Sequence, residues 1–129
     1  MSKLDQRTTK LLKGKNFAFV ATINRDGVPQ LTPTWIDTDG TNVLVNTALG
    51  RTKERNVARD KRVTVGLLDH SNPYDRVTIE GKVVKEIRGK EAEDHIDKLS
   101  YKYTGNKKYA GRTPSEKRVI FVIEPVKVY

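Results

Sequence analysis

The chain has 129 residues, which fits a single domain over residues 1–129 and leaves no room for a separate catalytic domain. Its hydrophobic fraction of 36% is below that of an average globular chain, which favours an oligomer in which a partner covers apolar surface. The lack of cysteine excludes disulfides, zinc fingers and thiol nucleophiles, and the net charge of +9 favours anionic partners: nucleic acid, lipid or small molecules.

The N-terminal segment, residues 1–15, is charged and has no apolar run typical of a secretory signal. Within it, residues 4–12 place leucines among charges and predict a short amphipathic helix. The longest apolar runs, such as residues 17–21, are too short to span a bilayer. We therefore expect a cytoplasmic protein without a membrane segment.

Three segments in the first half of the chain have the composition of β-strands. They cover residues 17–23, 28–36 and 42–47, and glycine-containing turns at 25–27 and 39–40 separate them. Pro29 and Pro33 remove two backbone donors from the second strand. Part of that strand should therefore lack one neighbour, and a flat ligand can lie against its open flank.

The second half of the chain predicts three more strands and two more helices. In chain order the elements are a short helix at 52–59, strands at 62–68 and 76–87 joined by a turn at 71–73, a helix at 91–103, a loop at 104–116, and a strand at 119–123 that can continue through 126–129. Gly81 inside the long strand indicates a bulge or a bend at a barrel corner. Six strands joined by hairpins predict a mainly β fold, an antiparallel barrel with short peripheral helices.

A basic segment, residues 51–62, is the strongest electrostatic feature of the sequence. It begins after a strand and Gly50, at the start of the predicted helix, where free backbone N–H groups favour an anion. The helix dipole disfavours Arg51, Lys53 and Arg55 at this end. A solvated charged helix face is one interpretation of the segment.

A bound phosphate is the other interpretation, because it would compensate the three cations. Arginine can grip a phosphate with two hydrogen bonds and lysine as a point charge, while Thr47 or Thr52 can add a hydroxyl. Nucleic acid is the less favoured anion, because single-strand binding uses aromatic side chains among the cations and residues 51–62 contain none.

Few other residues indicate chemistry. His70 and His95 are expected in a turn and on a helix surface, without a metal or catalytic role, and Asp37 is expected in a turn. Trp35 is expected in the core. Tyr109 flanks the flexible loop. Two roles are open for its side chain: packing against the fold, or forming part of a lid. No pair of carboxylates suggests acid–base catalysis, so no catalytic residue is identified.

Three motifs resemble a known family. The sequence VATINRDGVPQLTPTW at residues 20–35 resembles the first hairpin of the pyridoxamine 5′-phosphate oxidase-like split β-barrels. The sequence GRTKERNVARDKRV at residues 50–63 is similar to the second signature of that family, and residues 77–83 resemble its next strand. Within the family, the chain is most similar to the short flavin/deazaflavin oxidoreductases that use coenzyme F420.

The resemblance implies an FMN-binding-type split barrel and a homodimer with two cofactor sites at the subunit interface. The cofactor would be F420, or alternatively FMN, bound through its phosphate. The implied cofactor-binding residues are Thr47, Arg51, Thr52 and Lys53, with Arg55 and Asn56 of the same signature, at the phosphate; Pro33, Thr34 and Trp35 along the ring; and Tyr74, Arg76 and Tyr109 from the partner subunit.

The resemblance also implies an oxidoreductase that transfers hydride to or from an unidentified small organic substrate. A protein that binds or stores the cofactor without turnover is the alternative. True pyridoxamine phosphate oxidases carry a C-terminal arm with basic and histidine residues, and this sequence has none after its last strand. We therefore expect that the chain does not oxidise vitamin B6.

Overall fold

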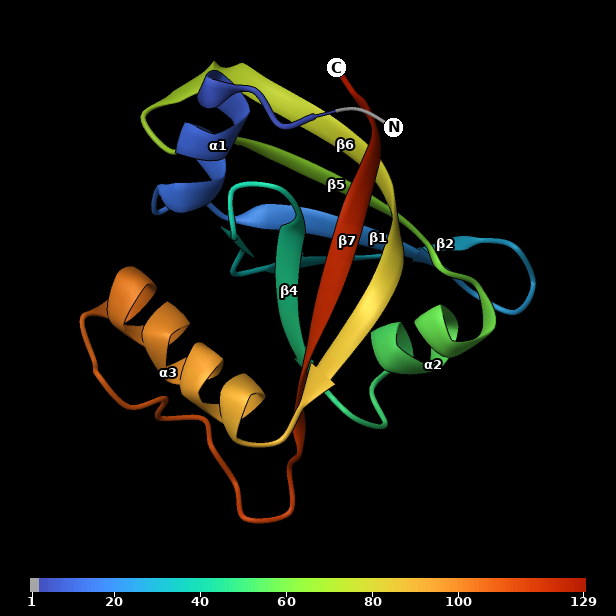
Figure 1. Cartoon of the computed structure of the whole chain (residues 1–129), viewed down its shortest axis with the longest axis vertical. Helices are drawn as coiled ribbons and strands as arrows, with labels where there is room; N and C mark the ends of the chain where they lie inside the picture. Colours follow the sequence, from blue (N-terminus) through green and yellow to red (C-terminus); the bar gives the residue numbers. More distant parts are fainter. Residues whose placement is uncertain (1–2) are drawn as a thin grey trace.

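The computed structural model describes residues 3–129 and consists of seven strands and three helices (Figure 1). The elements are α1 (Gln6–Lys13), β1 (Ala18–Ile23), β2 (Pro29–Thr34), β3 (Asp37–Thr38), β4 (Val43–Ala48), α2 (Thr52–Arg59), β5 (Arg62–Asp69), β6 (Asn72–Arg88), α3 (Lys90–Thr104) and β7 (Arg118–Val128). The first two residues of the predicted N-terminal segment lie outside the described part.

All seven strands form one antiparallel sheet in the order β2-β1-β5-β6-β7-β4-β3. Strands β2 and β3 follow each other in the chain with two residues between them, yet they occupy opposite edges of the sheet. The sheet therefore curls into a barrel that is split between these edges. Strand β2 pairs only with β1, which confirms the open flank expected from Pro29 and Pro33.

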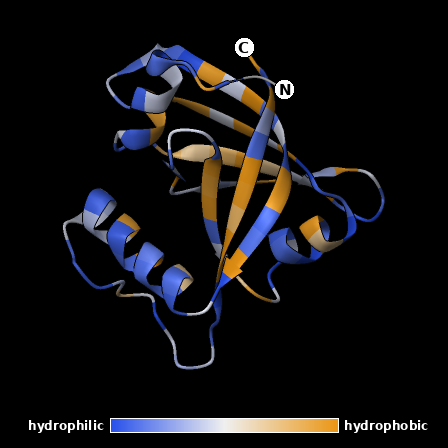
Figure 2. Ribbon diagram, in the orientation of Figure 1, coloured by the Kyte–Doolittle hydropathy of each residue, from blue (hydrophilic) through white to orange (hydrophobic). Residues whose placement is uncertain are grey.

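The core fills the inside of the curled sheet with side chains from alternate strand positions, seen as orange segments along the strands in Figure 2. Val20, Val65 and Phe121 are among its largest fully buried side chains. Helix α1 begins at Asp5, whose carboxylate accepts the Thr8 backbone N–H at 2.7 Å. Its buried Leu11 and Leu12, together with Val57 of α2, join the same core.

The structure differs from the sequence prediction in three boundaries. A seventh strand, β3, arises where two residues after Ile36 pair with β4, a length too short to leave a pattern. Strand β6 begins at Asn72 instead of residue 76, so the turn before it is tighter. Strand β7 runs without a break through Pro125, which the neighbouring β6 accommodates by register shifts at Glu80/Gly81 and near Val83.

A register shift between Glu80 and Gly81 confirms an irregularity at this point of β6, although the extra residue, Val126, lies on the partner strand β7. The close approach of β7 explains why a glycine stands at position 81. A Cβ atom at this position would lie 2.6 Å from the Glu124 carbonyl oxygen and 2.7 Å from Ile123 Cγ2. Such contacts are too short to exist without moving β7. None of the helices in residues 3–129 is long and apolar enough to cross a membrane.

We predict that Gly81→Ala destabilises the fold by about 1–3 kcal/mol, because the added methyl group overpacks the β6–β7 pair. Urea denaturation followed by circular dichroism measures the loss. Gly66→Ala on the neighbouring strand β5 is the matched control, since a Cβ there meets nothing within 4 Å. Equal losses for both variants would contradict the steric explanation.

Candidate functional site

A cleft of about 290 Å³ opens at the split, between the end of β2, strand β4 and the start of α2. Seven residues expected at the cofactor site line it: Pro33, Thr34, Trp35, Thr47, Arg51, Lys53 and Tyr109. Tyr109 was expected from the partner subunit, but it lines the cleft of its own chain. Phe17, Asn46, Ile96 and Arg118 complete its lining. Larger hollows lie elsewhere on the surface, and one of them is also lined by cations, but this one holds most of the expected site residues.

Three cations and one carboxylate surround the cleft. Glu116 accepts hydrogen bonds from Arg51 at 2.9 Å and from Arg118 at 2.6 Å, so it lies between two guanidinium groups. Lys53 Nζ donates to Thr32 Oγ1 of β2 at 2.8 Å and has no carboxylate partner within the described chain. Burial, followed by repulsion from Arg51 and Arg118, lowers the pKa of Lys53. An anion entering the cleft would relieve this repulsion.

The start of α2 is partly compensated by the chain itself. The Gly50 backbone N–H donates to Glu54 Oε1 at 2.9 Å, which places a negative charge in the first turn. Arg51 occupies the N-cap without a side-chain hydrogen bond to the helix. Glu54 and Glu116 thus meet part of the need for negative charge that the sequence assigned to a phosphate alone. The excess of cations over carboxylates at the cleft persists.

Thr47 carries a buried hydroxyl without a partner. The residue is 1% exposed, and its Oγ1 has no hydrogen-bond partner anywhere in residues 3–129. Leaving such a group unpaired costs about 1–3 kcal/mol. Because Thr47 lines the cleft, a ligand oxygen is a suitable partner for it. The unpaired hydroxyl and the surplus cations together fit a phosphate group.

Two aromatic side chains, Trp35 and Tyr109, also line the cleft. Trp35 stacks on Tyr103 with a centroid distance of 5.4 Å and meets the edge of Tyr109 at 5.9 Å. Trp35 therefore belongs to both the core and the cleft. It packs on the small cluster of Ile96, Leu99 and Tyr103, and it also lines the cleft. A cleft lined by both aromatic and cationic side chains suits a planar ring that bears a phosphate.

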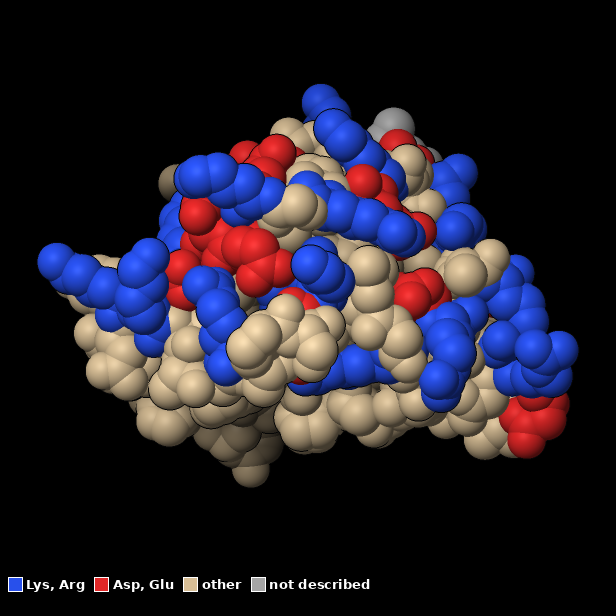
Figure 3. Space-filling model, turned by 90° about the horizontal axis from the view of Figure 1, so that it is seen from below, with Lys and Arg blue, Asp and Glu red and all other residues tan. Residues whose placement is uncertain are grey.

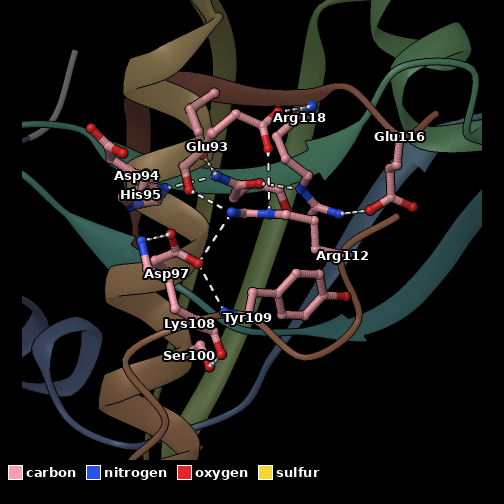
Figure 4. A network of polar contacts seen from close by, with 12 residues as sticks. Glu93, Asp94, His95, Asp97, Ser100, Lys108, Tyr109, Arg112, Glu116 and Arg118 are labelled. Atoms are coloured by element: carbon pink, nitrogen blue, oxygen red, sulfur yellow. Dashed lines mark hydrogen bonds and ion pairs between the residues drawn. The ribbon is translucent and has the colours of Figure 1, made fainter. Parts of the chain in front are cut away.

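The loop before β7 is fixed on α3 by polar contacts (Figure 4). Asp97 accepts the Tyr109 backbone N–H at 2.8 Å and Arg112 at 3.1 Å. Burial opposes the ionisation of Asp97, but these donors outweigh it and lower the pKa of the carboxyl. The predicted loop 104–116 therefore holds Tyr109 in place by its backbone, which brings the ring of Tyr109 beside Arg118 at 5.4 Å.

Arg118 is a central residue of the cleft that the sequence prediction missed. It is 5% exposed, and its Nε donates to Asn46 Oδ1 at 2.8 Å. Its backbone N–H donates to Glu93 at 2.9 Å, which joins the start of β7 to α3. The available signal was an asparagine in the otherwise apolar strand β4 and an arginine directly before the apolar run of β7.

His95 and Asp37 are buried, which corrects the expectation of a helix surface and a turn. His95 Nε2 lies 3.0 Å from Asp37 Oδ2, and its Nδ1 lies 3.1 Å from Asn46 Nδ2. His95 lies one helical turn from the buried Ala92 and Leu99, so it faces the sheet with them. His70 lies where it was expected, in the turn between β5 and β6, and it is exposed.

Asp37 stays ionised in this buried position. Burial alone would raise its pKa, but the hydrogen bond from His95, the Thr38 backbone N–H and the nearby Lys13 ammonium lower the pKa to about 2. Lys13 Nζ lies 3.7 Å from the carboxylate. Among residues 3–129, no three His, Cys, Asp or Glu side chains come together as metal ligands would.

Five of the expected site residues lie outside the cleft. Thr52, Arg55 and Asn56 line a separate hollow beside α2. Asn56 is buried and donates to Thr22 and Asn24, so its amide holds α2 against β1. Tyr74, 86% exposed, and Arg76 lie on β6 away from the cleft of their own chain. Their role was expected across a subunit interface, and it stays a prediction.

The curled antiparallel sheet with an open seam is that of a split β-barrel. The chain belongs to the pyridoxamine 5′-phosphate oxidase family, whose model matches residues 4–129. The expected fold and the expected family are thus confirmed. A comparison with curated proteins by sequence found no match.

Solved structures give the same assignment. An F420 reductase is 25% identical with a TM-score of 0.79, and the match covers 93% of this chain and 94% of that one. A conserved hypothetical protein of Mycobacterium tuberculosis is 26% identical with a TM-score of 0.75, covering 99% and 82%. General Stress Protein 26 of Bacillus anthracis, at 15% identity and a TM-score of 0.70 over 96% and 90%, shows the fold alone.

We predict that Asp37→Asn removes a pH-dependent part of the stability. A carboxyl whose pKa is lowered in the fold stabilises it above the unfolded value of 3.8, and this contribution is lost as the pH falls through about 2. The variant should be less stable by about 2 kcal/mol near neutral pH, with the deficit shrinking towards about pH 2. Urea denaturation of both proteins over this pH range measures it.

The exposed turn carboxylate of Asp26 provides the control. Asp26→Asn removes only an exposed charge, since the asparagine oxygen still accepts the Val28 backbone N–H, and it should cost much less stability. A deficit for Asp37→Asn that stays constant with pH would show that lost packing, and not lost charge, weakens that variant.

Proposed function

We propose that this protein is a flavin- or deazaflavin-dependent oxidoreductase that binds F420, or alternatively FMN, in the cleft at the split. The observation that carries the proposal is the convergence of Arg51, Lys53 and Arg118 on one cleft with a single carboxylate and the unpaired Thr47 hydroxyl. Similarity to an F420 reductase at 25% identity over almost the whole chain supports the deazaflavin.

Each group of residues has a distinct part in this proposal. The two arginines and Lys53 hold the phosphate, and Thr47 donates its hydroxyl to a phosphate oxygen. Pro33, Thr34 and Trp35 lie along the ring. The bound cofactor supplies the hydride chemistry, while the protein supplies position and electrostatics.

The described lining of the cleft contains no carboxylate or imidazole that faces a substrate. The side chains of this subunit therefore bind and orient, and a proton donor, where the reaction needs one, comes from solvent or from a partner subunit.

Storage of the cofactor without turnover is the alternative to an enzyme. Single-turnover oxidation of the reduced cofactor by candidate acceptors separates the two. The proposal keeps the cytoplasmic location expected from the sequence.

A second copy of this chain is the proposed occupant of an apolar face beside the cleft. Phe19, Leu31 and Leu68 are exposed on the outside of β1, β2 and β5, with Leu31 62% exposed. In the β1–β2 pair Phe19 stands opposite Pro33, which lines the cleft, so the face continues directly into it. Exposed apolar patches of this kind mark interaction sites. A partner seated there would lie against the bound ring.

We predict that Lys53→Ala weakens binding of F420 or FMN at least about tenfold, or about 1.4 kcal/mol, because it removes a cation from the phosphate site. Titration of the purified protein with each cofactor, followed by absorbance and fluorescence, measures the affinity. Lys61→Ala is the control: it makes the same change in net charge but removes an exposed side chain 3.9 Å from Glu86, outside the cleft.

Equal losses for the two lysine variants would mean that the general positive charge attracts the cofactor, and would remove Lys53 from the phosphate site. Tight binding of FMN without binding of F420 would replace the deazaflavin. Binding of neither cofactor would reject the proposed function.

We predict that Leu31→Glu separates the proposed dimer, because each subunit would place a charge against the apolar face of the other. Sedimentation velocity should show the wild type as a dimer and the variant as a monomer. Cofactor affinity should fall in parallel. Val126→Glu, at an exposed residue on β7, is a control expected to remain dimeric. A wild type that sediments as a monomer would refute the shared site.

A further inference from the structure

A continuous chain of hydrogen bonds links the buried His95 to the cationic cleft. Asp37 contacts His95, His95 contacts Asn46, and Asn46 Oδ1 accepts from Arg118 Nε at 2.8 Å. Arg118 in turn binds Glu116, which also holds Arg51. The end of this chain is the phosphate-binding group of the proposed function, on which the inference rests.

The polarity of the contacts fixes where the proton of His95 lies. The Asn46 amide cannot be turned over: its nitrogen faces the Ala92 carbonyl oxygen at 3.0 Å, which only accepts, and its oxygen faces Arg118 Nε, which only donates. His95 Nδ1 faces that same amide nitrogen and must therefore accept. The ring proton consequently lies on Nε2 and is donated to Asp37.

A second proton on His95 conflicts with this arrangement. It would place an Nδ1–H against the two N–H groups of the Asn46 amide. Turning the amide would satisfy His95, but would set the amide nitrogen against Arg118 Nε and the amide oxygen against the Ala92 carbonyl. Either arrangement leaves buried polar groups unpaired or opposed, which is unfavourable. Protonated His95 and the observed position of Arg118 therefore exclude each other.

Charged groups on every neighbouring element face this histidine. Asp37 of β3 attracts a second proton, and the Lys13 ammonium of α1 beside that carboxylate opposes it. Arg118 of β7 acts through Asn46 of β4. The remaining ionisable groups are Asp39 after β3 and Glu91, Asp94 and Lys98 of α3, which line the hollow beside His95, and Lys102 of α3, which lies near Asp37.

We propose that neutral His95 is a positioning residue that holds Arg118 in the cleft through Asn46, and that protonation of His95 withdraws Arg118 and weakens binding of a phosphate-bearing ligand. The site therefore holds its ligand while His95 is neutral and releases it when His95 gains a second proton. His95 does not touch the ligand and acts only through Asn46.

Two measurements test the coupling. The first follows the ring nitrogens of His95 and Arg118 Nε by ¹H–¹⁵N NMR in the ligand-free protein between about pH 8 and about pH 5. We expect the proton on Nε2 at the upper pH, and a shift of the Arg118 Nε resonance with the same midpoint as the His95 titration. A proton on Nδ1, or an Arg118 resonance that ignores His95, overturns the proposal.

The second measurement uses FMN and F420 titrations of the wild type and His95→Gln at the two ends of this pH range. Glutamine offers one acceptor and one donor but gains no charge. Acidification should weaken binding about tenfold more in the wild type than in His95→Gln. Ionisation of the ligand phosphate affects both proteins equally and cancels in this comparison. His70→Gln, at the exposed histidine, should behave as the wild type.

The outcomes separate this inference from the proposed function. Equal pH dependence of ligand affinity in the wild type and in His95→Gln overturns the inference and leaves the cofactor site intact. Failure of both cofactors to bind rejects the proposed function, while the NMR titration still decides whether His95 controls Arg118. The same titration of the wild type decides the question if His95→Gln does not fold.

Discussion

The sheet ends at β2, and the site depends on that ending. Two prolines in six residues leave β2 with a single neighbour, so the curled sheet stays open along this edge. The opening is bridged by a side chain, since Lys53 at the start of α2 reaches Thr32 on β2 at 2.8 Å. The cleft thus lies where the backbone pairing of the sheet stops, and it is lined by the edge strand β2 and by cationic side chains.

Cationic side chains outnumber carboxylates around this opening. Figure 3 shows Lys and Arg side chains across much of one end of the molecule, with acidic side chains between them. Most of these surface pairs contribute little to stability. The exceptions are buried or half-buried: specific donors hold the carboxylates of Glu116 and Asp37, whereas Arg51 and Arg118 repel Lys53.

The sequence predicts the features that depend on short stretches of chain. Alternation and glycine turns located the long strands, and the prolines predicted the edge, because each proline removes its own backbone donor. Gly81 marked the irregularity in β6, but not its cause, which is the close approach of β7. The residues that sequence reasoning missed act through partners far along the chain. Arg118 meets Asn46 72 residues away, and His95 meets Asp37 58 residues away. No local pattern records such pairs, although the helical spacing of His95 from Ala92 and Leu99 marks the face it shares.

Glu116 has a consequence for how any anion enters the cleft. By holding Arg51 and Arg118 together, it lets the cationic site assemble during folding, so the side-chain entropy of the arginines is lost before a ligand arrives. An anion bound as we propose would meet a receptor that is already ordered. It would also compete with Glu116, because a hydrogen bond that it takes from either arginine is one that Glu116 gives up. Such competition would favour reversible binding.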